Sequence, residues 1–527
     1  MTAKRRWVGL AMFSVAALVI GLDLTILAVA LPTLSRELHA SQSELQWFST
    51  AFMLTLAAAM LPTGVLGDRI GRRKTLVGAL VVFAGGSLWC ALSTTPGELI
   101  AARALMGVPA AAIAVVTFAM IAVMFTPEER PKAIGIMMGA TFLGMPLGPV
   151  LGGWILTNAW WGWVFLINVP VAVIALVGIL LTVPETKPTH AGRVDVVGMV
   201  GFTAGLVALT YGLITAGQNG WDDAAALGWM AAGILILVAF AFCELWIART
   251  GRNPVIPPRL FRVRGFTAGT IVPAIGSMAL TGLLFLLPQY FQAIGGQDAM
   301  GSGVRLLAVI AGFVPASLLS SVATRLMGAR FASGLGYVIA AAGLWTISQA
   351  TASTPESLVL IGSGVLGFGI ALGLSAAASA ALSHIAPDDA NTASSVYQAL
   401  QKTGSPLGVA ILGSIFNRVY VQNLVLPAQL PHSVRTVVED GVFGGLAVGA
   451  KVPGVTDAVR QAFMDGLEAT MWACVGIALA TAVIAMLTLP GRSSRGSGRG
   501  AESIRPAEEA AAAKATPVIE TTPLVES

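Results

Sequence analysis

The sequence predicts an all-α membrane protein with 14 transmembrane helices, on the strength of three observations. Of its 527 residues, 56% are hydrophobic and 11% are charged, whereas a soluble domain carries about 25% charged residues. Apolar runs of about twenty residues recur along the chain, and each is long enough to cross a bilayer as a helix. Lysine and arginine gather in alternate connections between these runs, as they do in chains that cross a membrane repeatedly.

The apolar runs form two similar parts with an insertion between them. We expect an N-terminal six-helix bundle in residues 1–190, two inserted helices and a basic cytoplasmic loop in 191–264, and a C-terminal six-helix bundle in 265–490. "MPLGPVLGG" (145–153) and "SPLGVAILG" (405–413) are similar and lie 260 residues apart. Such pseudo-repeats typically face each other across a binding site at mid-membrane. The predicted spans are 7–33, 44–66, 75–94, 97–122, 132–157, 161–183, 195–216, 225–247, 265–292, 302–324, 331–350, 356–383, 391–417 and 466–489.

The basic residues predict the orientation, because they are retained on the cytoplasmic side. With the N-terminus inside, the cytoplasmic connections contain eighteen lysine and arginine residues before the tail. The outside connections contain five, four of them in one long extracellular loop at 418–465. We therefore expect both termini in the cytoplasm, with residues 491–527 as a disordered tail of low-complexity composition. The net charge of +5 reflects this topology, and no pattern favours nucleic-acid binding.

A charged corner, "TGVLGDRIGRRKT" (63–75), joins the second and third spans on the expected cytoplasmic side. Its basic residues fit anchoring at lipid headgroups, and its glycines allow a sharp turn. Acids contribute little to topology, so Asp68 needs another explanation. The corresponding corner "TRLMGARF" (324–331) has no acid. The motif residues are Gly64, Asp68, Arg69, Gly71, Arg72 and Arg73.

Three charged residues are expected inside spans. Asp23 lies about 15 Å below the outer end of the first span, where an acid costs about 2.5–3.5 kcal/mol, so we expect it to face the interior and to be functional. The alternative is a permanent ion pair that holds two helices together. Arg103, in the fourth span, either partners Asp23 or extends to the membrane surface. Lys402, in the thirteenth span, needs an acceptor or lies on the wall of a water-filled cavity.

A row of glycines marks the fifth span. Gly144, Gly148 and Gly152 recur every four residues, on one helix face that allows close contact with another backbone. Gly153 lies one position off this row, and we expect it to tolerate alanine better than Gly148 tolerates leucine. The alternative is ordinary packing of membrane helices.

These motifs resemble those of the major facilitator superfamily, and in particular its fourteen-span drug:proton antiporters. "GVLGDRIGRRK" resembles the signature between spans 2 and 3, and "GMPLGPVLGG" (144–153), which includes Pro149, resembles the antiporter signature of span 5. "LDLTILAVALP" (22–32) and "RALMG" (103–107) are similar to the signatures of spans 1 and 4. One departure is Met106, which stands where the family commonly has glutamine.

The resemblance implies roles for these residues. Asp23 and Arg103 would couple transport to protons, the corner at 63–75 would form a cytoplasmic gate, and the antiporter motif would seal the path between the bundles. By this resemblance Asp68 docks on the N-terminus of the thirteenth span, capped by Asn391 or Thr392, when the cytoplasmic side closes.

We therefore expect a proton-coupled exporter of amphipathic drugs or antibiotics that works by alternating access, in a bacterial cytoplasmic membrane. The alternatives are export of an endogenous metabolite, peptide or siderophore, or a membrane sensor with the same fold. The expected partners are a neutral, zwitterionic or monocationic small molecule, protons and the lipid bilayer, and we expect a monomer. No constellation suggests an enzyme, a metal or another cofactor, and no ATP-binding loop occurs.

Overall fold

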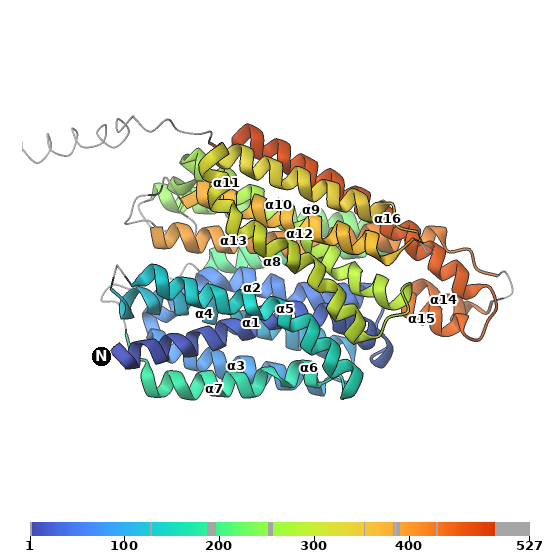
Figure 1. Cartoon of the computed structure of the whole chain (residues 1–527), viewed down its shortest axis with the longest axis horizontal. Coiled ribbons are helices and arrows are strands. Elements are labelled where there is room, and N and C mark those ends of the chain that lie inside the picture. Colours follow the sequence, from blue (N-terminus) through green and yellow to red (C-terminus); the bar gives the residue numbers. More distant parts are fainter. Residues whose placement is uncertain are drawn as a thin grey trace, which may run out of the picture.

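The computed structural model describes residues 3–490, apart from 127–128, 187–195, 251–256, 352–353, 383–384, 386–389 and 428–429. The predicted tail at 491–527 lies outside the described residues. Every regular element in the described ranges is a helix, which confirms the all-α prediction. The long helices run roughly side by side (Figure 1).

Helices α1 to α7 pack on one another and form what we call the first helix group. Its pairs include α1 with α5, α2 with α4 and α3 with α7. Its members are α1 (Ala3–Glu37), α2 (Gln42–Ile70), α3 (Arg72–Leu92), α4 (Pro96–Met124), α5 (Arg130–Asn158), α6 (Trp163–Leu166) and α7 (Asn168–Thr182).

The second helix group is built around α10 and α13, which pack on each other and on α16. It comprises α10 (Arg264–Ala293), α11 (Ala299–Ser348), α12 (Glu356–Leu382), α13 (Ala390–Asn423) and α16 (Val455–Thr488). Two short helices, α14 (His432–Asp440) and α15 (Val442–Gly449), precede α16, and the 3-10 helix η1 (Pro258–Arg262) precedes α10. The segment predicted as the loop 418–465 is thus helical over much of its length.

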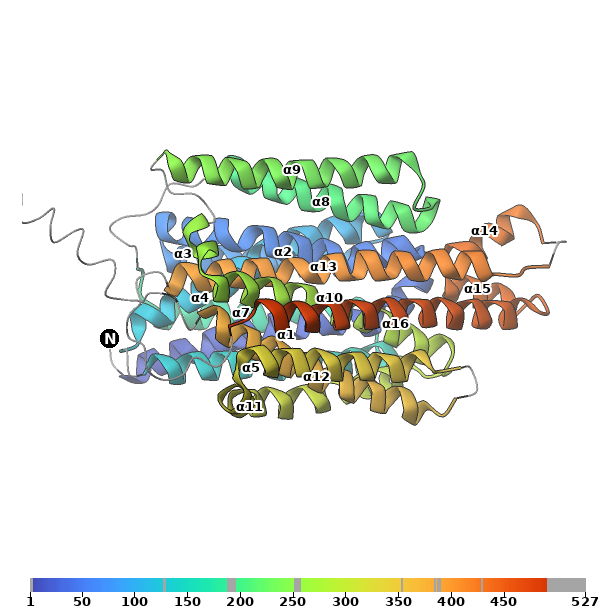
Figure 2. The same cartoon turned by 90° about the horizontal axis from the view of Figure 1, so that it is seen from above.

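A helical hairpin lies beside the two groups, made of α8 (Val196–Asn219) and α9 (Ala224–Arg249) (Figure 2). Its inner helix α8 packs on both α2 and α13. Ser414 Oγ donates to Leu213 O at 2.6 Å, and Asn417 Nδ2 donates to Gly217 O at 3.0 Å. Gln218 Nε2 of α8 also donates to Ser43 Oγ of α2 at 2.5 Å, so the hairpin is hydrogen-bonded to both groups.

Among the described residues, eleven helices are long and apolar enough to cross a membrane, or twelve when the two arms of α2, bent by 54°, are taken as one span. Helix α11 has 50 residues and is interrupted by Gly328, whose φ of 82° and ψ of 158° are not helical. At about 1.5 Å per residue a straight helix of that length would far exceed a bilayer. Gly312 and Gly343, on either side of the break, both contact residues 362–366 of α12, so the two arms of α11 fold back alongside each other.

The two ends of the molecule differ. We call the end where α1 begins and α16 finishes the terminal end, and the end that carries α14 and α15 the loop end (Figures 1 and 2). The charged corner between α2 and α3 lies at the terminal end, because α2 begins at the loop end.

The pseudo-repeat predicted from the sequence has a counterpart in side-chain contacts. Thr25 Oγ1 of α1 donates to Met145 O of α5 at 3.1 Å, and Thr281 Oγ1 of α10 donates to Ser405 O of α13 at the same distance. The corners also match, because Gly71 has φ 117° and Gly328 has φ 82°. These positive φ values explain why both corners need glycine.

The two helix groups meet at the loop end and separate toward the terminal end. A Cβ atom on Gly153 of α5 would lie 2.6 Å from Met300 Cα of α11, so the backbones touch there. Gly135 lies eighteen residues earlier in α5, which is five helical turns and therefore the same face. A Cβ on Gly135 would meet no atom within 4 Å. Helices α5 and α11 diverge toward the terminal end (Figure 1), and we call the space between them there the gap.

Candidate functional site

A buried ion pair lies inside the first helix group. Arg103 Nη1 donates to Asp23 Oδ2 at 2.6 Å, and the side chains are 1% and 0% exposed. The structure thus brings together the two residues that the sequence singled out for proton coupling. Arg103 does not extend to the surface, so that alternative is wrong. The alternative of a permanent structural pair stays open, since the geometry fits it as well.

The pair is held by polar groups from three further helices. Asn168 Nδ2 donates to Asp23 Oδ1 at 3.0 Å and lies 3.3 Å from Ser87 Oγ. Arg103 Nε donates to Phe48 O at 3.2 Å, and its guanidinium lies 4.4 Å from the centre of the Phe52 ring. Both carboxylate oxygens therefore have a donor, which a buried charge requires.

Sequence reasoning missed Asn168. Its signal was available, because Asn168 is the polar residue in the run "WGWVFLINVPVAV" and begins α7. A lone amide inside an apolar segment is costly unless it finds a partner.

The departure at Met106 affects the surroundings of the pair. Cys90 Sγ lies 3.4 Å from Met106 Sδ, and Ser87 Oγ lies 3.8 Å from it. The thioether thus packs against Ser87 and Cys90 of α3. The polar contacts of Arg103 come instead from Asp23 and from Phe48 O of α2.

The glycine row of α5 packs on the helix that carries Asp23. A Cβ on Gly144 would lie 2.5 Å from Leu18 O, and one on Gly148 would lie 2.8 Å from Leu22 O. A Cβ on Gly152 would lie 2.7 Å from Ile26 Cγ1. The row therefore brackets Asp23 on α1 with close backbone contacts.

Gly153 and Pro149 lie on a different face, against the second helix group. The expectation that Gly153 tolerates alanine better than Gly148 tolerates leucine stays a prediction, but Gly153 is not free of contacts, because a Cβ there would lie 2.6 Å from Met300 Cα and 2.7 Å from Ala299 O. Backbone atoms cannot rotate away as a side chain does. A Cβ on Gly303 of α11 would likewise meet Pro149 O at too short a distance. The antiporter motif thus contacts α1 on one face and α11 on another.

The charged corner is shaped by a glycine turn and by a second acidic residue, Glu185. Gly71 separates α2 from α3 with its positive φ. Glu185 accepts from the backbone N–H groups of Arg73 and Lys74 at 3.2 Å each, at the N-terminus of α3. A carboxylate is favoured there by the helix dipole. No periodic pattern in the sequence points to Glu185, which lies just beyond α7.

Some of the remaining residues of the corner motif form ion pairs or hydrogen bonds, and others pack against neighbouring helices. Arg72 Nη2 lies 2.9 Å from Asp68 Oδ1, and Arg73 Nη2 donates to Leu180 O at 2.8 Å. Arg69 lies in the last turn of α2. A Cβ on Gly64 would lie 3.1 Å from Val115 of α4, so this glycine serves packing. Helix α13 begins at Ala390, so Asn391 and Thr392 lie inside its first turn and are not its N-cap as expected. Their side chains lie outside the described residues, and docking of Asp68 at this N-terminus stays a prediction.

Lys402 lies near the middle of α13 and is half-buried. Within the described part of the chain no hydrogen bond or ion pair involves its ammonium group, which fits the cavity-wall alternative. Nor do the described residues contain a group of three or more His, Cys, Asp or Glu side chains placed to hold a metal ion.

Known proteins resemble this chain along most of its length. The family model described as Major Facilitator Superfamily matches residues 13–409. The tetracenomycin C resistance and export protein of Streptomyces glaucescens is 28% identical, over 92% of each chain. The puromycin resistance protein pur8 of Streptomyces alboniger is 31% identical, over 95% of each chain.

A solved structure shows the same fold. It is the crystal structure of a bacterial homologue of the human lysosomal transporter Spinster, in an inward-facing and unoccupied conformation. The match has a TM-score of 0.66 at 15% identity and covers 93% of this chain and 98% of that one.

Proposed function

The chain belongs to the Major Facilitator Superfamily, and from this premise we propose that it exports an amphipathic drug or antibiotic in exchange for protons. The two relatives described above are an antibiotic export protein and an antibiotic resistance protein. The observation that carries the proposal is the buried pair of Asp23 and Arg103, packed against the antiporter motif.

Asp23 is the proposed proton carrier. Arg103 supplies the counter-charge of its carboxylate, and a buried carboxylate that lost this partner would be far costlier than a protonated one. Protonation removes the charge attraction and frees α1 to shift. Asn168 positions the carboxylate through its second oxygen. Movement of one proton through about 100 mV supplies about 2.3 kcal/mol, which sustains roughly a fiftyfold gradient of a neutral substrate.

We propose that the terminal end faces the cytoplasm and that the chain crosses a bacterial inner membrane fourteen times. This count treats the two arms of α11 as two separate spans. The bent α2 and α13 count as one span each, and α6 and α7 together count as one. The excess of basic residues in the terminal-end connections supports the orientation. The six-helix bundles at 1–190 and 265–490, with the insertion at 191–264, are part of the same proposal, as is a monomeric state.

Alternating access then uses the two helix groups as the moving parts. Their contact at the loop end and their separation at the terminal end correspond to a path open to the cytoplasm. Asp68, now paired with Arg72, would exchange that partner for the N-terminus of α13 when the terminal end closes.

The test is transport into inverted membrane vesicles that contain the purified, reconstituted protein under an imposed pH gradient. Uptake of an antibiotic that collapses with the pH gradient supports proton-coupled export. Binding without flux would refute it and leave the sensor alternative. The second candidate function is export of an endogenous compound, which would show flux only with extracts of the host. It ranks second because the two relatives are associated with antibiotics.

A further inference from the structure

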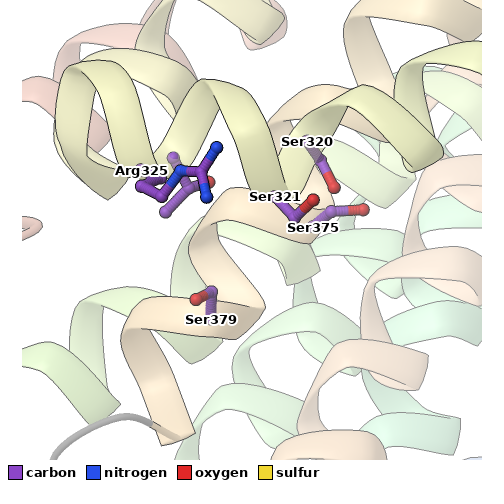
Figure 3. A pocket seen from close by; sticks show the side chains of 6 residues that line it. Ser320, Ser321, Arg325, Ser375 and Ser379 are labelled. Carbon is purple, nitrogen blue, oxygen red and sulfur yellow. The ribbon is translucent and has the colours of Figure 1, made fainter.

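A polar pocket of about 420 Å³ lies in the second helix group, between the first arm of α11 and α12 (Figure 3). Its volume falls in the range of small-molecule sites. All of its lining side chains carry hydrogen-bond donors and none is acidic. They are Ser320, Ser321, Thr324, Arg325, Ser375 and Ser379.

Four of the five hydroxyl groups that line this pocket make no bond to the backbone of their own helix in the described part of the chain, whereas the fifth, that of Ser320, donates to Ser317 O at 2.6 Å. Helical serine and threonine commonly donate to the carbonyl four residues earlier, as Thr50 and Thr117 do here. Within the described residues, the hydroxyls of Ser321, Thr324, Ser375 and Ser379 make no such bond and Arg325 has no carboxylate partner. Several donors and one cation thus converge on the pocket without an acceptor from the described chain.

The pocket opens toward the gap between the two helix groups. Gly303 of α11 contacts Pro149 of α5 at the loop end. Ser321 follows Gly303 by eighteen residues, which is five helical turns, so it occupies the same face of α11 near the terminal end. There the facing position of α5, Gly135, has no neighbour within 4 Å. The donors are therefore accessible from this gap.

An apolar stripe borders the pocket on α11. Leu318, Val322 and Leu326 are 75%, 41% and 60% exposed. Arg325 lies three residues after Val322 and seven after Leu318, so it stands at the edge of this stripe. A ligand with an anionic head and an apolar tail matches both surfaces at once.

We propose that this pocket binds the headgroup of an anionic phospholipid at the terminal-end mouth of the gap, with an acyl chain along the apolar stripe. The phosphate accepts from Arg325 and from the serine and threonine hydroxyls, because charge-assisted bonds to phosphate favour arginine. Basic pockets between membrane helices on the cytoplasmic side suit such headgroups. Arg325 holds the position that Asp68 holds in the other corner, three residues before the corner glycine, so the repeat has reversed its charge here.

The test measures the thermal unfolding midpoint of the full-length protein in neutral detergent while phosphatidylglycerol or phosphatidylcholine is added. We expect phosphatidylglycerol to raise the midpoint and phosphatidylcholine to have little effect. Arg325→Gln should raise the half-saturating lipid concentration roughly tenfold, and Ser375→Ala with Ser379→Ala should raise it a few fold. Native mass spectrometry then counts the lipids that each variant retains.

The matched control is Arg262→Gln, which removes an exposed arginine from the same end of the molecule, in η1. Equal weakening by Arg325→Gln and Arg262→Gln would overturn the proposal, since it would indicate general attraction of anionic lipid to a basic surface. Stabilisation by inorganic phosphate at the concentration at which the lipid acts would also overturn it, in favour of a site for free anions. Retained drug transport by the serine variants shows that they are folded.

Discussion

Replacement of Asp23 by asparagine separates proton coupling from helix packing. Asparagine keeps the size of the side chain and one acceptor oxygen but cannot carry a charge. It leaves Arg103 buried beside a neutral group, and loss of one partner of a buried pair costs about 3–5 kcal/mol. Arg103 keeps its bond to Phe48 O and its contact with the Phe52 ring. We therefore expect Asp23→Asn to lower the free energy of unfolding by about 3 kcal/mol, at the lower end of that range.

The double variant, Asp23→Asn with Arg103→Gln, distinguishes the two roles of the pair. It removes both charges and leaves two neutral groups that can bond to each other, so the free energy of unfolding should recover by about 2 kcal/mol relative to Asp23→Asn. A pair that only holds helices together would regain transport with that stability. A proton carrier would not, because the carboxylate that carries the proton is gone.

The assays are unfolding in mixed micelles, proton release on drug binding, and efflux driven by an imposed pH gradient. We expect both variants to bind drug, to release no proton and to fail to concentrate drug against a gradient. Concentrative, pH-dependent efflux by either variant would refute the reasoning. Proton coupling would then lie elsewhere, and Lys402 would be the next group to test.

Four further predictions concern the helix contacts around this pair and the charged corner. Gly148→Leu should abolish coupled efflux, because even a Cβ at that position would lie 2.8 Å from Leu22 O. Gly153→Ala should slow efflux, because the added methyl group favours separation of the two helix groups at the loop end. Equal, unimpaired efflux rates of the two variants in transport assays would contradict both predictions. Asn168→Leu should shift the pH optimum of efflux, because Asp23 loses one hydrogen-bond donor. Asn168→Ser keeps a donor group and should shift the optimum less. Efflux measured over a series of pH values tests both variants. Asp68→Asn should slow transport at normal membrane expression, and a wild-type rate would exclude a gating role.

The helical fold was accessible from the sequence because each span repeats one simple physical requirement. A run of about twenty apolar residues satisfies the bilayer without reference to its neighbours. The glycine at the corner, Gly71, could equally be predicted, since a sharp turn between two helices needs a positive φ. The side-by-side arms of α11 were also separated correctly as two segments, at 302–324 and 331–350, on either side of Gly328.

The parts that escaped prediction depend on how helices rotate against one another. Asp23 and Arg103 could be paired because a buried charge needs a counter-charge. Asn168 and Glu185 could not be placed, because their partners lie 145 and about 110 residues away in the sequence. The contact of Gly153 with α11 was not foreseen for the same reason, since a position one step off a helix face meets a different neighbour. Composition cannot supply that rotational detail.

Helix α5 links the proposed proton site to the contact between the two helix groups. On one face its glycines touch the backbone of α1 from Leu18 to Ile26, the stretch that contains Asp23. On another face Gly153 touches α11. Close backbone contacts leave little room for gradual adjustment, so a shift of α1 on protonation must either be absorbed by α5 or carried to α11. Pro146 and Pro149 lie between these contacts and remove backbone donors there. Bending of α5 at these prolines is thus the most direct physical route from the charge of Asp23 to the opening between the groups.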